Sequence, residues 1–205
     1  MRNSVLISIL FLSLGCSPSP YVHLTKQEGK APCLQSLRPQ FSTVLYNAQV
    51  NVSGNHLSGL LLFKTMPDSS IRAIFTNEMG VSFFDFEFAK TGFRVVSCIS
   101  KMNKKVVINR LRSDLSLLIM YGLKLDQPEI FLAGNETYYS FVLKNEHVYY
   151  VTDVTCSRIS RIETASKRKK KIQVNLTGND SGMPDSVYLA HQSFEYNITL
   201  KKIIR

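Results

Sequence analysis

The residue types that most often carry catalysis are present in this 205-residue chain, but their spacing assembles no catalytic site. The sequence has no serine elbow, zinc-binding helix motif, phosphate-binding glycine loop or calcium-binding loop. Asp85 and Glu87 stand two residues apart, so on a strand they share one face and could form a carboxylate pair. We expect them instead to be solvated or paired with neighbouring lysines. The histidines are scattered, and a lone strand histidine is more often structural than a base: His23, His56, His147 and His191. We therefore expect no enzyme activity, no metal and no cofactor.

The cysteines indicate neither a zinc site nor a redox pair, because no two of them stand in a CxxC spacing. Three lie beyond the N-terminal region, at Cys33, Cys98 and Cys156. An oxidising compartment permits one disulfide among three pairings and leaves one thiol over. The alternative is that all three are buried as small apolar side chains.

The N-terminus has the layout of a secretory signal. Arg2 supplies one positive charge, residues 5–14 are mostly apolar, and Gly15 is a small residue at the end of that run. A membrane-spanning helix needs about 20 apolar residues, so this run is too short to remain as a span. We expect residues 1–15 to be a signal peptide that is removed on export.

The end of this signal, Leu12-Ser13-Leu14-Gly15-Cys16, resembles the lipobox of bacterial lipoproteins, in which the cysteine is acylated. The resemblance implies a firm membrane anchor at Cys16, because each buried methylene of an acyl chain contributes about 0.8 kcal/mol. Ser17 in the next position implies the outer membrane, with the domain facing the periplasm. The Ser-Pro-Ser-Pro tract at 17–20 suits an extended tether. An ordinary signal peptidase that recognises Ser13 and Gly15 is the alternative, and it would leave a soluble protein.

Basic residues give the chain a net charge of +10 and gather in one region. We call this set the basic cluster: Arg158, Arg161, Lys167, Arg168, Lys169, Lys170 and Lys171. Such runs bind phosphate, but export argues against nucleic acid as a partner. Two interpretations stay open. The cluster is either a solvated turn that adds solubility or a patch attracted to anionic lipid headgroups.

Hydrophobic periodicity predicts a β-rich chain with one central helix. Residues 44–99 alternate between apolar and polar side chains, with Tyr46 and Ala48 on one face, which predicts about five antiparallel strands. From 103 to 121 the period changes to 3.6, which predicts an amphipathic helix capped by Asn103 and ended by Gly122. Strands resume between 136 and 200. No later stretch is long and apolar enough to cross a membrane.

Two passages resemble the superfamily of periplasmic lipoprotein carriers and outer-membrane lipoprotein receptors. Residues 59–64, Gly-Leu-Leu-Leu-Phe-Lys, with 71–75 after them, look like its opening strands, and 184–189 with 196–200 look like its closing pair. In those proteins an unclosed half-barrel, lidded by helices, holds acyl chains in an apolar cavity. The resemblance implies that this chain binds or transfers a lipid or a lipoprotein acyl group. We expect its cavity to be lined by Phe63, Phe84, Phe86, Phe88, Leu111, Leu115 and Leu118.

The predicted organisation has three parts: the signal peptide at 1–15, a lipidated tether and linker at 16–40, and one domain at 41–205. The predicted fold is mainly β (α+β), an antiparallel open half-barrel of about ten strands with the helix as its lid. The alternative function is a structural or assembly lipoprotein with a fully packed core. Such a protein would bind a protein partner through a sheet edge or the basic cluster.

Overall fold

The computed structural model describes residues 19–29, 32–52, 54–143, 146–166, 169–178 and 182–203. Within these ranges thirteen strands form one antiparallel sheet, accompanied by two helices. The strands are β1 Thr25–Gln27, β2 Thr43–Val52, β3 Asn55–Thr65, β4 Ile71–Thr76, β5 Ser82–Ala89, β6 Gly92–Cys98, β7 Glu129–Ala133, β8 Glu136–Leu143, β9 Glu146–Asp153, β10 Ile159–Ala165, β11 Lys170–Thr177, β12 Ser186–His191 and β13 Tyr196–Lys202. The helices are α1 Pro32–Ser36 and α2 Lys105–Leu118.

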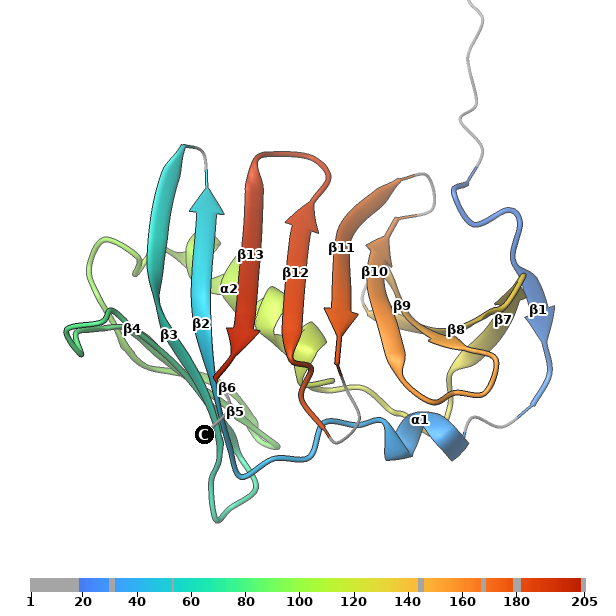
Figure 1. Ribbon diagram of the computed structural model, residues 1–205, viewed down its shortest axis with the longest axis horizontal. Helices are drawn as coiled ribbons and strands as arrows, with labels where there is room; N and C mark the ends of the chain where they lie inside the picture. The colour runs from blue at the N-terminus through green and yellow to red at the C-terminus, as the bar shows by residue number, and fades with distance from the viewer. Residues whose placement is uncertain are drawn as a thin grey trace, which may run out of the picture.

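The sheet is open, as the sequence predicted. Its strand order is β1-β7-β8-β9-β10-β11-β12-β13-β2-β3-β4-β5-β6, so the edge strands β1 and β6 are not paired with each other. The last strand lies in the middle, because β13 pairs with β2, with Tyr196 opposite Val52 and Lys202 opposite Tyr46. The sheet curls around α2, which crosses its concave face (Figure 1). The predicted mainly β half-barrel with a central helix is confirmed, with three strands more than the expected ten or so.

Alternation along the strands separates an apolar concave face from a polar convex face. On β2, Tyr46 and Ala48 are buried while Asn47 and Gln49 are exposed, as the pattern predicted. The main hydrophobic core lies between the concave face and α2. A second, smaller core lies around Tyr21, Tyr138 and Tyr149, where the N-terminal residues cover β8 and β9. The sheet therefore has a different cover on each side.

The central helix is shorter than the sequence predicted. Its N-cap is Lys104, in extended conformation and without a side-chain capping bond, so the expected cap at Asn103 is wrong. The C-cap is Ile119, and Gly122 follows with φ 75°, a left-handed conformation that glycine adopts without strain. In the described ranges, neither helix is long and apolar enough to cross a membrane.

The segment expected to be a linker, 16–40, contains two ordered elements. β1 pairs with β7, with Lys26 opposite Phe131, and α1 places Leu34 in the core at 0% exposure. Cys33 of this segment forms a disulfide with Cys156, across a Cα–Cα distance of 6.2 Å, which selects one of the three pairings and leaves Cys98 free. The N-terminal segment is thus joined covalently to the turn after β9. The signal peptide and Cys16 lie outside the described residues.

Candidate functional site

The aromatic residues predicted to line a cavity share the concave face of the early strands. Phe84, Phe86 and Phe88 alternate along β5, so the two-residue period of the strand points all three toward α2. Each is at most 3% exposed, and the rings of Phe84 and Phe86 stack with their centroids 4.3 Å apart. Phe63 of β3 is completely buried in the same core. The structure therefore brings these four rings together.

The predicted leucines of α2 meet those rings from the other side. Leu111, Leu115 and Leu118 follow one another at helical spacing and are at most 6% exposed. All seven predicted residues belong to one hydrophobic cluster. The helix itself covers the aromatic face, and these side chains pack together in one core.

A buried acid on α2, which the sequence analysis missed, lies within this apolar interface. Asp114 is 0% exposed, and both its carboxylate oxygens lie 3.2 Å from Nε2 of His191 on β12. Arg110 of α2 approaches the other ring nitrogen, Nδ1, at 3.3 Å. Because a guanidinium can only donate, Nδ1 must accept, and Nε2 must carry the proton that is donated to Asp114. These contacts hold the imidazole of His191 between Arg110 and Asp114.

Aromatic rings surround these three side chains. The ring of Tyr196 meets that of His191 at a centroid distance of 4.7 Å, and Arg110 lies 5.3 Å from the ring centroid of Phe194. Burial raises the pKa of Tyr196, and the charge of Asp114 adds to that effect. We call Arg110, Asp114 and His191 the polar latch. Together with its aromatic neighbours, the polar latch holds α2 at one position on β12 and β13.

Two further hydrogen bonds join α2 and the residues after it to the sheet. The hydroxyl of Tyr150 on β9 donates to the carbonyl of Leu117 at 2.8 Å, and Tyr121 donates to the carbonyl of Ala89 at 2.7 Å. The tyrosine on β9 is buried and the acceptor lies near the end of the helix. The cover is therefore held by apolar packing and by a small number of specific polar contacts.

Three of the five described members of the basic cluster are paired with carboxylates. Arg161 pairs with Glu136 and Glu163, and Lys170 pairs with Glu163 as well. Lys171 pairs with Glu146. Of the other members, Arg158 and Lys169 are exposed, while Lys167 and Arg168 lie outside the described residues. The carboxylates come from neighbouring strands, so the described part of the cluster offers few unpaired charges.

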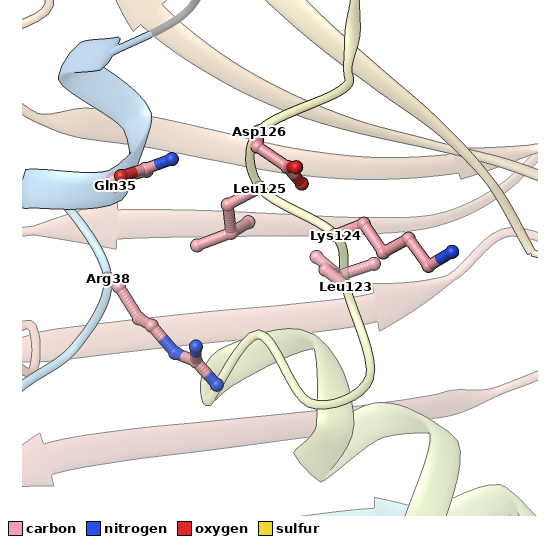
Figure 2. Close-up of a pocket in the computed structure, with 6 residues that line it drawn as sticks. All are labelled: Gln35, Arg38, Leu123, Lys124, Leu125 and Asp126. Atoms are coloured by element: carbon pink, nitrogen blue, oxygen red, sulfur yellow. The ribbon is translucent and has the colours of Figure 1, made fainter.

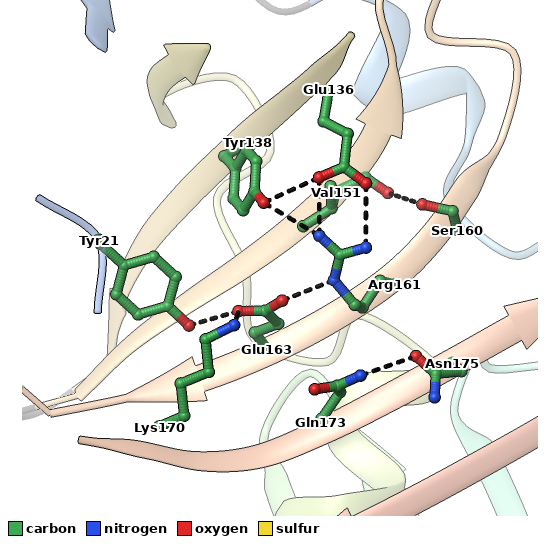
Figure 3. A network of polar contacts seen from close by, with 10 residues as sticks. All are labelled: Tyr21, Glu136, Tyr138, Val151, Ser160, Arg161, Glu163, Lys170, Gln173 and Asn175. Atoms are coloured by element: carbon green, nitrogen blue, oxygen red, sulfur yellow. Dashed lines mark hydrogen bonds and ion pairs between the residues drawn. The ribbon is translucent and has the colours of Figure 1, made fainter. Parts of the chain in front are cut away.

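The N-terminal segment takes part in this network on the convex face (Figure 3). The Tyr21 hydroxyl donates to Glu163 at 2.5 Å, and the Tyr21 ring stacks on Tyr149 at 4.3 Å. Burial opposes ionisation of Glu163, but hydrogen bonds from Tyr21, Lys170 and Arg161 outweigh it and hold the carboxyl pKa below its usual value. Glu163 is only 1% exposed. It is the charged centre on which residues 19–27 dock.

Asp85 and Glu87, the acidic pair of the sequence analysis, lie in ion pairs on the convex face. Asp85 is paired with Arg72 of β4, and Glu87 with Arg94 of β6 at 2.9 Å. The partners are arginines on adjacent strands rather than the lysines we expected. In the described ranges no three of the His, Cys, Asp and Glu side chains gather as metal ligands would.

An open hollow of about 500 Å³ lies between α1 and the loop after α2. Its lining residues are Gln35, Arg38, Leu123, Lys124, Leu125 and Asp126. Gln35 points toward Leu125, whereas Arg38 points away from it and Lys124 points away from α1 (Figure 2). None of the seven residues predicted to line a cavity borders this hollow, although Leu125 belongs to the same hydrophobic core.

No protein-family model matches this chain, and no curated protein matches it. Solved structures are similar at the level of overall shape. A DUF1329 family protein from Desulfovibrio piger ATCC 29098 is 12% identical, with a TM-score of 0.46, over 83% of this chain and 87% of that one. A domain from Vibrio parahaemolyticus, provisionally assigned to outer membrane lipoprotein sorting, is 6% identical, with a TM-score of 0.46, over 84% and 89%. At these values the likeness carries no argument about what this chain binds or where it acts.

Proposed function

We propose that this chain is an envelope lipoprotein that binds or transfers a lipid or a lipoprotein acyl group on the concave face of its half-barrel, with α2 as the lid. One observation carries the proposal: a long apolar face of an open sheet is covered mainly by one helix, α2. An acyl chain that takes the place of the leucines of α2 would keep this face dry, so the exchange loses little apolar burial. The activity is binding, and we assign it no catalytic step.

The lid must move for a ligand to enter, because the predicted lining residues are buried against one another. The polar latch suits a cover that leaves and returns to one position. A buried set of polar contacts adds little net stability compared with apolar side chains, whereas its geometry specifies one arrangement. Asp114→Asn should therefore speed uptake of a fluorescent fatty acid, measured by stopped flow. Asp85→Asn, which removes a carboxylate on the convex face, is the matched control and should leave the rate unchanged.

The membrane anchor is the second part of the proposal. We place the acyl group on Cys16 and the protein at the outer membrane, facing the periplasm, as the lipobox resemblance implies. Cys16→Ser should move the protein from the detergent phase to the aqueous phase after Triton X-114 partitioning. If the variant partitioned as the unmodified chain does, the lipidation proposal would fail.

The main test is native mass spectrometry of the full chain carrying Cys16→Ser, so that no acyl group anchors it, purified from a bacterial periplasm without detergent. A bound species of lipid mass is the expected result, and its mass would name the ligand class. A clean unbound mass, with no uptake when phospholipid or fatty acid is added, would overturn the carrier proposal.

The close packing of the core favours one other function. Phe63 and Phe86 are 0% exposed, which is what a fully packed structural domain also requires. Under this second proposal the chain is an assembly lipoprotein that binds a protein partner, with the unpaired edge of β6 as the natural site for an added strand. A clean unbound mass, together with a partner that protects the β6 amides from hydrogen exchange, would support it.

A further inference from the structure

Two of the most exposed apolar side chains of the described residues, Met79 and Val106, lie on neighbouring segments. Met79 and Val81, in the turn between β4 and β5, are 88% and 55% exposed. Val106, in the first turn of α2, is 80% exposed. Exposed apolar side chains are unfavourable in water, and three of them on neighbouring segments favour a surface that contacts an apolar partner.

The two segments are held side by side by the end of the sheet. The Ile99 amide, just after β6, donates to the carbonyl of Phe83 on β5 at 3.0 Å. Val81 precedes Phe83 by two residues, and the loop that leads to α2 leaves from Ile99, where the Met102 amide turns back to its carbonyl. Figure 1 shows both loops at the left end of the molecule. They form one projecting tip.

This tip also carries unpaired positive charge. Lys101, Lys104 and Lys105 are exposed, and in the described part of the chain none of them has an ion-pair partner. The acidic residue on the adjoining turn is Glu78. The basic cluster differs in part, because Arg161, Lys170 and Lys171 are matched by carboxylates. Its exposed members without an ion pair among the described residues are Arg158 and Lys169, whereas the tip has three such lysines within five positions.

We propose that this surface docks onto an anionic lipid bilayer, and we call it the basic tip: Met79, Val81, Lys101, Lys104, Lys105 and Val106. Single apolar side chains that project from turns can enter the headgroup region, while the lysines meet lipid phosphates. The charge complementarity selects a membrane over a protein partner as the occupant. This inference rests on the proposed function: because the lid α2 begins at this tip, docking would place the lid next to the membrane.

The first experiment uses the absence of tryptophan from the sequence. A Met79→Trp substitution introduces a single fluorophore, in a full chain that also carries Cys16→Ser so that no acyl group anchors it. With phosphatidylglycerol vesicles its emission should shift to the blue and be quenched by brominated lipid. A Val154→Trp chain is the matched control, because Val154 is 61% exposed in the turn between β9 and β10. A shift at both sites, or at neither, would overturn the proposal.

The second experiment tests the charges. Replacing Lys101, Lys104 and Lys105 by glutamine should weaken binding to these vesicles by roughly 100-fold, because each lysine near an anionic surface contributes about fivefold. A matched triple replacement of Lys64, Lys90 and Lys201, which are exposed elsewhere, should have a much smaller effect. Equal binding to phosphatidylcholine vesicles would overturn the electrostatic part. Complete absence of vesicle binding would overturn the docking proposal and leave a protein as the partner of the tip.

The two proposals fail in different ways. A chain that docks on vesicles but takes up no fatty acid would contradict the proposed carrier function alone. A chain that takes up fatty acid while its Met79→Trp emission ignores anionic vesicles would contradict the basic tip alone.

Discussion

The two faces of the sheet are covered by different means. On the concave side, α2 contributes an apolar stripe and one buried polar latch. On the convex side, residues 19–27 dock through Tyr21 on the buried charge of Glu163. Apolar contacts tolerate sliding and exchange, whereas a charge network holds one register. The comparison indicates that α2 is suited to detach from the concave face, whereas the N-terminal segment is suited to remain bound to the convex face.

The largest expected effect breaks the concave cover. Leu115→Arg places a charge at a site that is 2% exposed, and it should cost more than about 4 kcal/mol of folding stability. Val106→Arg, on the exposed side of the same helix, should change stability by less than about 0.5 kcal/mol. Chemical denaturation of both variants checks this. Similar midpoints would show that α2 is not packed on the sheet.

Reduction of the Cys33–Cys156 disulfide frees the segment that follows the convex cover from the turn after β9. The bond closes a loop across a sequence separation of 123 residues, so its loss should cost about 2 to 5 kcal/mol. Thermal unfolding with and without reductant measures the difference. Cys98→Ser should unfold as the unmodified chain does, because that thiol is free. A reductant effect that survives in a Cys33→Ser variant would have another source.

A substitution in the convex network should have a smaller effect and release only the N-terminal segment. Glu163→Gln leaves Arg161 and Lys170 without their shared buried carboxylate, and it should cost about 2 kcal/mol. Trypsin should then cut more quickly after Lys26, in β1. Tyr21→Phe removes one hydrogen bond to the same carboxylate and should lie between this variant and the unmodified chain. Unchanged cleavage rates in both would show that the network does not hold the segment.

The smallest expected effect is the loss of the Glu163 network when the pH is lowered. The folded pKa of Glu163 is lowered, so the network stabilises fully above the unfolded pKa of about 4.3 and loses its contribution as pH falls through the folded value. Amide hydrogen exchange of β1 should therefore accelerate below about pH 4, before the concave core opens. In Glu163→Gln this acid step should be absent. Opening of both covers at the same pH would remove the distinction between them.

Local pattern was sufficient for the long strands and the helix, because alternation and the leucine stripe reflect burial on one face. It missed β1, whose Thr25–Gln27 are all exposed, and it extended α2 beyond both ends. The polar latch was invisible, because Asp114 and His191 are far apart in sequence and belong to different elements. The pairing of the basic cluster was hidden for the same reason, since Glu136 and Glu146 lie on strands other than those of their partners. Sequence spacing gives the composition of a surface but not its partners.

The pairing of β13 with β2 has a consequence for biogenesis. Strands β2–β6 and β7–β13 form two half-sheets whose only shared ladder joins the last strand of the chain to its first long one. Such long-range contacts form slowly, because chain closure must precede them. During synthesis, a chain that emerges N-terminus first cannot complete its sheet until residue 202 has followed. Until then, both half-sheets present bare edges that can pair with other chains.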